Sequence, residues 1–154
     1  MLNRLRREKH VMREAVGLQY RILLRNELKD VRTLMLETCS SIPDPIRHPI
    51  ELLIKSGGKQ LRPALVILYA KLAPVDPDKV LLVAAGVEML HTATLIHDDL
   101  IDNAQLRRGV GTLNQTWSPT ATVLAGDALF AMAAKLIAQT GNTTMAYRFS
   151  ETLE

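Results

Sequence analysis

The hydrophobic positions of this chain follow a helical pattern. Apolar residues recur three and four positions apart along most of the sequence, which is the spacing of one face of an α-helix. Proline and glycine residues divide this pattern into segments. The predicted helices lie near residues 4–38, 45–55, 59–72, 77–103 and 119–139, and a further helix begins near residue 143. No strand, repeat or interdomain linker is predicted, so we expect an all-α fold.

The helix predicted near residues 77–103 carries acidic side chains in an otherwise apolar sequence. Asp98 and Asp102 are four positions apart, so they lie about 40° apart around the helix. His91 falls within about 20° of the same line, whereas Asp99 points about 100° away from Asp98. Burying carboxylates on an apolar face is costly without a cation. We therefore expect Asp98 and Asp102 to bind a metal or a cationic ligand, with Asp99 in a supporting role.

The residue types indicate which metal this would be. Carboxylates as the only acidic ligands favour a hard cation such as Mg2+, which completes its coordination with water and substrate phosphate. Zinc sites use several Cys or His ligands. The chain has a single cysteine, Cys39, and four separated histidines. Mg2+ is therefore the expected cofactor, and an intramolecular disulfide is excluded.

Basic residues on both sides of the acidic helix supply the opposite charge. The sequence GGKQLRP at residues 57–63 reads as a glycine turn into a helix, with Lys59 and Arg62 one turn apart near its start. Free amide groups and the helix dipole also favour anions there. Arg107 and Arg108 follow the acidic helix in a loop that contains glycine. The pattern indicates a Mg2+-bridged diphosphate on the aspartates and a second anion on the basic groups.

These motifs and their intervals resemble the trans-prenyl diphosphate synthases, from about residue 28 to the C-terminus. The resemblance implies an isoprenoid-synthase-type helical bundle. It also implies that Asp98 and Asp102 bind Mg2+ and the allylic diphosphate, and that Arg107 contacts the allylic diphosphate, so that these three are the catalytic candidates. The positions that hold isopentenyl diphosphate in the family correspond to Lys59, Arg62, His91 and Arg108.

The reaction that the resemblance implies is chain elongation of an isoprenoid. An allylic prenyl diphosphate ionises to a carbocation, joins isopentenyl diphosphate and loses a proton, while Mg2+ and basic groups stabilise the departing diphosphate. In a synthase of this kind the product tail should pass Thr94 and Ala93, which lie four and five positions before Asp98. Both side chains are small, so we expect a medium- to long-chain polyprenyl diphosphate.

The family pattern continues beyond the motifs found here. Its members are considerably longer and carry a second aspartate-rich motif, whereas no Asp follows Asp127 in this chain. We therefore expect a basic helical extension over residues 1–27 and the N-terminal half of a synthase domain over residues 28–154, ending within a helix. Such a half should be inactive alone and should expose apolar surface. The full-length form is expected to be a homodimer.

Two other functions remain open. A class I terpene cyclase uses a similar aspartate-rich motif and helical fold, but it lacks the GGKxxR site for a second diphosphate. A non-catalytic subunit of a heteromeric synthase could bind prenyl diphosphates without turning them over. Such subunits usually have eroded aspartates, whereas Asp98, Asp99 and Asp102 are all present. Condensation by a prenyltransferase is therefore the favoured interpretation.

Composition and charge fit this picture. The 154 residues are 47% hydrophobic and 4% aromatic, which is typical of a helical protein, and the formal net charge is only +3. No nucleic-acid partner is expected. The surplus of positive charge lies within residues 4–13, an arm that makes at most peripheral contact with an anionic membrane. No membrane span or signal peptide is predicted, and a cytoplasmic location is expected.

Overall fold

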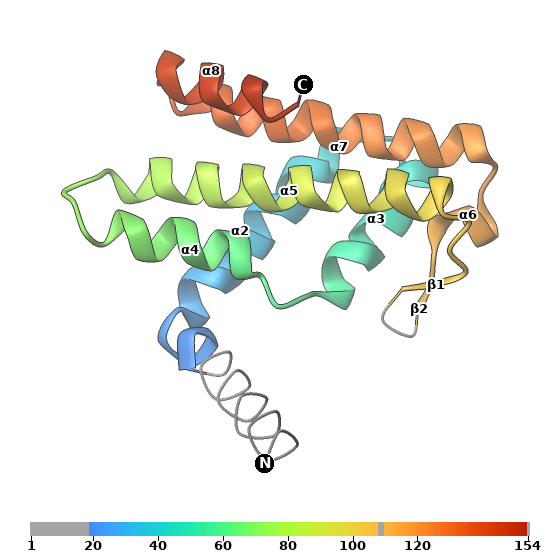
Figure 1. Cartoon of the computed structure of the whole chain (residues 1–154), viewed down its shortest axis with the longest axis horizontal. Coiled ribbons are helices and arrows are strands. Elements are labelled where there is room, and N and C mark those ends of the chain that lie inside the picture. The colour runs from blue at the N-terminus through green and yellow to red at the C-terminus, as the bar shows by residue number, and fades with distance from the viewer. Residues whose placement is uncertain (1–18, 108–109, 154) are drawn as a thin grey trace, which may run out of the picture.

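The computed structural model describes residues 19–107 and 110–153. Within these ranges the chain is an all-α bundle, as expected (Figure 1). The basic arm of residues 4–13 lies outside them. The elements are α2 (Arg25–Thr38), the 3-10 helix η1 (Cys39–Ser41), α3 (Asp44–Ser56), α4 (Leu61–Ala70), α5 (Pro77–Ile101), β1 (Leu106–Arg107), β2 (Val110–Gly111), α6 (Leu113–Thr116), α7 (Pro119–Gln139) and α8 (Thr143–Glu151).

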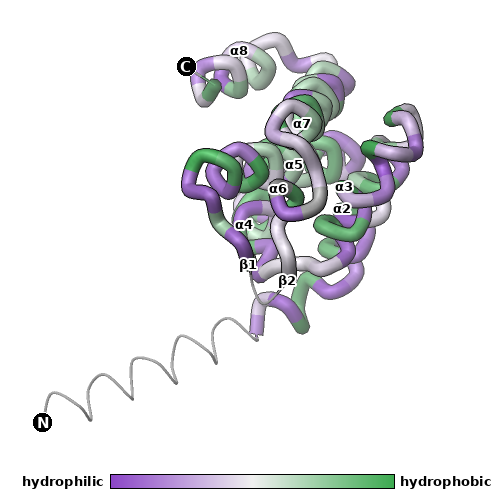
Figure 2. Tube along the Cα trace, turned by 90° about the vertical axis from the view of Figure 1, so that its right-hand side faces the viewer, coloured by the Kyte–Doolittle hydropathy of each residue, from purple (hydrophilic) through white to green (hydrophobic). Residues whose placement is uncertain are grey.

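Helix α5 is the central element of the bundle. It packs along α7 over most of its length, and α4 and α2 pack on its other sides. Figure 1 shows α7 and α8 above α5 and α4 below it, and Figure 2, turned by 90°, shows α2 and α3 on the side of α5 away from α4. Helix α5 is therefore held by neighbouring helices on several sides.

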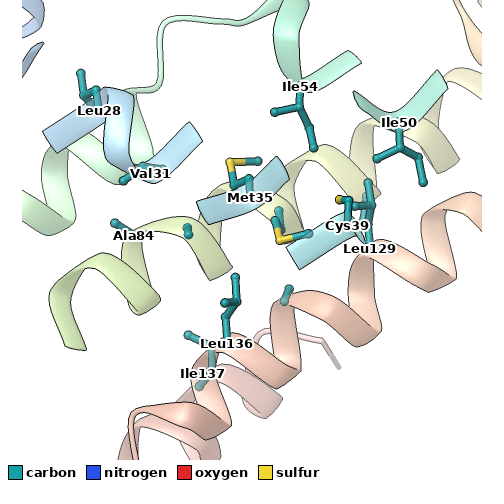
Figure 3. Close-up of a cluster of buried hydrophobic side chains, with 14 of the residues drawn as sticks. Leu28, Val31, Met35, Cys39, Ile50, Ile54, Ala84, Leu129, Leu136 and Ile137 are labelled. Atoms are coloured by element: carbon teal, nitrogen blue, oxygen red, sulfur yellow. The ribbon is translucent and has the colours of Figure 1, made fainter. Parts of the chain in front are cut away.

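The core lies between these helices. Fully buried side chains from α2, α3, α5 and α7 meet there, as the close-up in Figure 3 shows. They include Val31, Ile50, Met89, Leu129 and Leu136. Cys39 belongs to this cluster, and its burial raises the pKa of its thiol from 9.0 to about 11, with a smaller contribution from the charge of Glu51. The cysteine therefore acts as a neutral packing residue.

The ends of the two long helices are fixed by sequence signals. Asp76 caps α5 by accepting a hydrogen bond from the backbone N–H of Asp78, and Ser118 caps α7 by accepting one from Ala121. A proline occupies the first turn of each helix, where it needs no hydrogen-bond partner. These caps explain why the helices begin where the sequence predicts.

Several boundaries differ from the sequence-based prediction. The first long helix is interrupted by a turn at Leu24. Helix α4 begins at Leu61 and not at Lys59, because Gln60 has a left-handed backbone with φ 48°. The expected loop before α7 contains α6 and a minimal hairpin that pairs Leu106 with Gly111. Helix α8 ends at Glu151, so the expectation of an unbroken helix at the chain end is wrong.

Parts of the bundle present apolar side chains to solvent. Helix α4 carries an exposed stripe that consists of Leu61, Leu65 and Tyr69 and continues to Leu72 beyond the helix end. By length and composition alone, α5 and α7 are each long and apolar enough to cross a membrane. The sequence-based expectation is that the chain contains no such segment. In this bundle α5 and α7 pack against each other, as the core helices of water-soluble proteins also do.

A glycine allows α5 and α7 to approach closely. The ring of His97 lies against the backbone of α7, where a Cβ added to Gly126 would be 2.1 Å from His97 Nε2. The same nitrogen lies 3.2 Å from the carbonyl oxygen of Val123, and Phe130 contacts the ring at a centroid distance of 5.4 Å. Gly126 therefore has a structural role, and His97 packs against α7.

Replacing Gly126 with Ala should displace the His97 ring and lower the free energy of unfolding by about 1–3 kcal/mol, the usual cost of overpacking. Gly86→Ala is the matched control on the same helix pair. There the added carbon meets the flexible end of Ile137 at 3.0 Å, and a gain in helix propensity of about 1 kcal/mol offsets the crowding. Urea denaturation measures both variants. Equal destabilisation of the two would contradict the close fit described for His97.

Candidate functional site

A cavity of about 300 Å³ opens between α2, α3, α5, the loop before α4 and the segment that leads into α6. One wall is a stripe of α5 that contains Glu88, His91, Leu95 and Asp99. The opposite wall includes Arg32 from α2 and apolar residues from α3. Gly57, Gly58 and Gln60 form the loop side of the cavity, and Gly111, Thr112 and Leu113 close another side. The cavity is therefore apolar on α3 and polar near the glycine loop.

The three aspartates of α5 do not share one environment. Asp99 is 7% exposed, lines the cavity and has an interaction partner. Asp98 and Asp102 are exposed and do not line the cavity. The expectation that Asp98 and Asp102 are sunk into an apolar face is therefore wrong for the described residues. The reason is that the cavity walls and α7 occupy the other sides of this turn.

The exposed pair still has the chemistry of a hard-cation site. Asp98 and Asp102 lie one turn apart at the C-terminal end of α5, where the helix dipole is negative and acidic groups are unfavourable without a cation. Among the described residues neither carboxylate forms an ion pair. The same residues contain no group of three or more metal-binding side chains. Two carboxylates fit Mg2+, which commonly keeps several waters and binds substrate phosphate.

His91 lies between these two regions. It lines the cavity, which places it on the side of Asp99, and it has an interaction partner. Its helical position is also within about 20° of the line through Asp98 and Asp102. Thr94 donates a hydrogen bond to the carbonyl oxygen of His91 at 2.8 Å. His91 therefore marks the edge at which the cavity and the acidic end of α5 meet.

The loop over residues 57–60 is held by the helical segment that precedes α2. Gly57 ends α3 with φ 67°, a left-handed conformation that favours glycine. The hydroxyl of Tyr20 donates to the carbonyl oxygen of Lys59, and the guanidinium of Arg21 donates to that of Gly58 at 3.4 Å. Lys59 precedes α4, a correction to its predicted place within the helix, and its side chain is exposed. The side chain of Arg62 is exposed too, in the first turn of α4.

The remaining predicted residues have simpler positions. Arg107 belongs to β1, where its backbone pairs with Val110, but its side chain and all of Arg108 lie outside the described part of the chain. Ala93 is fully buried in the core, whereas Thr94 is partly exposed. Neither Ala93 nor Thr94 lines the cavity. The described residues thus bring His91 and Asp99 together with the glycine loop.

The fold is matched by known proteins. The family model for polyprenyl synthetase matches residues 43–154. The chain belongs to the polyprenyl synthetase family. It is 36% identical over 121 residues to the short chain isoprenyl diphosphate synthase of Methanothermobacter thermautotrophicus. The aligned region covers 78% of this chain and 37% of that protein. It is 30% identical over 129 residues to the octaprenyl diphosphate synthase of Escherichia coli, and this alignment covers 84% of this chain and 40% of that protein.

Solved structures of the polyprenyl synthetase family show the same helical fold. The polyprenyl synthase of Caulobacter crescentus, complexed with calcium and isoprenyl diphosphate, aligns with a TM-score of 0.78 and 38% identity over 83% of this chain and 39% of that one. A decaprenyl diphosphate synthase from Rhodobacter capsulatus aligns with a TM-score of 0.77 and 38% identity over 83% and 40%. The expected family and isoprenoid-synthase fold are confirmed, and the chain spans about two fifths of these relatives.

Two residues at the cavity are absent from the motif-based prediction. Arg32 lines the cavity from α2, and its guanidinium donates a hydrogen bond to Gln60 Oε1 at 3.1 Å. Gln60 belongs to the GGKQLRP motif, but the sequence assigns no function to it. No sequence signal identifies Arg32, because a single arginine on an amphipathic helix is usually a solvated residue. Only the approach of α2 to the glycine loop reveals it.

The different environments of the aspartates predict different consequences of substitution. Asp98→Ala or Asp102→Ala should weaken Mg2+-dependent binding of geranyl diphosphate roughly ten- to hundredfold, because each removes a charged ligand. Asp99→Ala should leave that affinity within about threefold but lower the free energy of unfolding by about 1–3 kcal/mol, because a buried polar side chain is lost from the core side of α5. Calorimetric titration and urea denaturation separate the two effects. Equal losses of affinity at all three positions would contradict this division.

Proposed function

We propose that this chain provides the diphosphate-binding half of a trans-polyprenyl diphosphate synthase. The complete enzyme would condense isopentenyl diphosphate with an allylic prenyl diphosphate in the presence of Mg2+. One observation carries the proposal: on the fold of the polyprenyl synthetase family, the glycine loop and His91 line a cavity, and Asp98 and Asp102 are exposed at the C-terminal end of the same helix that carries His91. This arrangement offers separate regions for a cation-bound diphosphate and for a second anion.

The chemistry proposed for the chain is binding and charge stabilisation. Mg2+, held by Asp98 and Asp102, would polarise the allylic diphosphate as it leaves. Arg107 would contact the same diphosphate, while Lys59, Arg62, His91 and Arg108 would hold isopentenyl diphosphate. The two carboxylates leave most metal positions to other ligands. We therefore propose that the 154-residue chain binds diphosphates but does not turn them over alone.

The test is an assay with labelled isopentenyl diphosphate, geranyl diphosphate and Mg2+. It compares the 154-residue chain with a fusion in which residues 1–154 replace the matching part of the Escherichia coli octaprenyl diphosphate synthase. The fusion should form polyprenyl diphosphate and the chain alone should not. In the fusion, Asp98→Ala should lower the rate at least about hundredfold, the scale of losing a key charged contact in the transition state. Asp78→Ala, at the opposite end of α5, should stay near the parent rate.

A heteromeric arrangement is the second candidate. The chain is 41% identical over 90 residues to a protein named heptaprenyl diphosphate synthase component 2 in Geobacillus stearothermophilus. A requirement for a separate second chain, with no turnover by the fusion, would favour this candidate.

A homodimer in the cytoplasm remains our proposal for the full-length protein. The exposed apolar residues Leu124, Met145 and Tyr147 on α7 and α8 support association.

The proposed product is a medium- to long-chain polyprenyl diphosphate, because Ala93 and Thr94 offer no bulky floor to a growing tail. Thr94 is partly exposed, so Thr94→Phe in the fusion should fold and shorten the product. Ala93 is fully buried, and Ala93→Phe should instead destabilise the bundle by about 1–3 kcal/mol or more through overpacking. Chromatography of the dephosphorylated products measures chain length. An unchanged product distribution with Thr94→Phe would mean that the tail follows another route.

A further inference from the structure

Helix α2 brings a row of cations to the glycine loop. Arg25, Lys29 and Arg32 of α2, together with Arg21 from the segment before it and Gln60, line a shallow groove beside the loop. Arg32 differs from the other three cations because it also lines the cavity on the far side of the loop, together with Gly57 and His91. It is therefore the one member of this row that reaches both the groove and the cavity.

The position of Arg32 is set by Gln60. Gln60 is 9% exposed and accepts the hydrogen bond from the Arg32 guanidinium at 3.1 Å, while its own amide nitrogen donates to the carbonyl oxygen of Leu28 at 3.4 Å. The guanidinium also lies over the loop backbone, 3.4 Å from where a Cβ of Gly57 would be. Gln60 thus ties Arg32 to the turn that the sequence identifies as a diphosphate site.

The charge of Arg32 is not neutralised by this contact. Gln60 is uncharged, and no carboxylate among the described residues forms an ion pair with Arg32. On the same helix, Glu27 is paired with Lys71 at 2.9 Å, a hydrogen bond that lowers the pKa of Glu27. Glu88 and Asp99, the acidic residues that line the cavity, have interaction partners of their own. A partly buried guanidinium with unused N–H donors therefore faces the cavity.

We propose that Arg32 is a further diphosphate-binding residue and that Gln60 is its positioning residue. The inference rests on the proposed function, because the ligand is the diphosphate end of isopentenyl diphosphate. Lys59, Arg62 and His91 would approach that group from the loop, α4 and α5, and Arg32 would approach it from α2. The planar guanidinium suits this task because it can donate two parallel hydrogen bonds to phosphate oxygens.

The experiment is calorimetric titration of the 154-residue chain with isopentenyl diphosphate at fixed ionic strength. Arg32→Gln should weaken binding roughly ten- to hundredfold, since hydrogen bonds to charged groups carry effects of that size. Lys29→Gln is the matched control: it removes the same charge from the same helix, but Lys29 lines the outer groove and not the cavity. It should change affinity by less than about threefold, as expected of a screened surface charge.

Two further variants test the contact itself. Arg32→Lys keeps the charge but cannot donate the paired hydrogen bonds, so its affinity should fall between those of the parent and Arg32→Gln. Gln60→Leu should weaken binding in the parent but have no further effect in the Arg32→Gln background, because Gln60 acts through Arg32. Additive losses for Gln60→Leu and Arg32→Gln would overturn the positioning role. Circular dichroism melts of each variant accompany the titrations.

The outcomes also separate this inference from the proposed function. Equal losses for Arg32→Gln and Lys29→Gln would show a general field effect and overturn the contact. Binding that is lost with Lys59→Gln but unchanged with Arg32→Gln would overturn the role of Arg32 while supporting the diphosphate site. No binding of isopentenyl diphosphate by the folded, unsubstituted chain would overturn both. If Arg32→Gln fails to fold, Arg32→Lys with full parental affinity would still overturn the proposed contact.

Discussion

The close packing of α5 against α7 is the constraint on which the rest of the structure depends. Gly126 permits it, because the ring of His97 lies where a Cβ at this position would be. Because interiors are close-packed and yield little, these contacts fix the rotation of α5 about its own axis. His97 directly precedes Asp98, so the same packing determines which aspartates face solvent and which one faces the cavity.

Electrostatics explain why this rotation matters. Three aspartates lie at the negative end of the α5 dipole, where acidic groups are unfavourable. Asp99 is accommodated by burial with a partner, whereas Asp98 and Asp102 remain exposed without an ion pair among the described residues. The exposed pair is thus a local excess of negative charge that a divalent cation would neutralise. Packing and charge together distinguish residues that are adjacent in the sequence.

Much of the fold was predictable because its boundaries are marked by strong local signals. The prediction for residues 119–139 matches α7, which begins at a serine cap with a proline and ends before Gly141. The burial of Asp99 was not predictable. Periodicity gives the angle between two side chains on a helix, but α5 is apolar on nearly every side, so its pattern cannot say which face its neighbours cover. The backbone of Gln60 escaped prediction for a similar reason, since left-handed φ is uncommon outside glycine.

The division of α5 into two faces bears on how a condensing enzyme could hold two diphosphates without letting them repel each other. The acidic end of the helix suits a diphosphate whose charge is carried by a metal. The cavity side, with His91 and Arg32 near the glycine loop, suits a diphosphate bound by protein cations. The acidic end and the cavity side belong to one rigid helix, and they differ by a fraction of a turn around its axis. The distance between two bound substrates would then be set by the helix itself, which requires no motion of one site relative to the other.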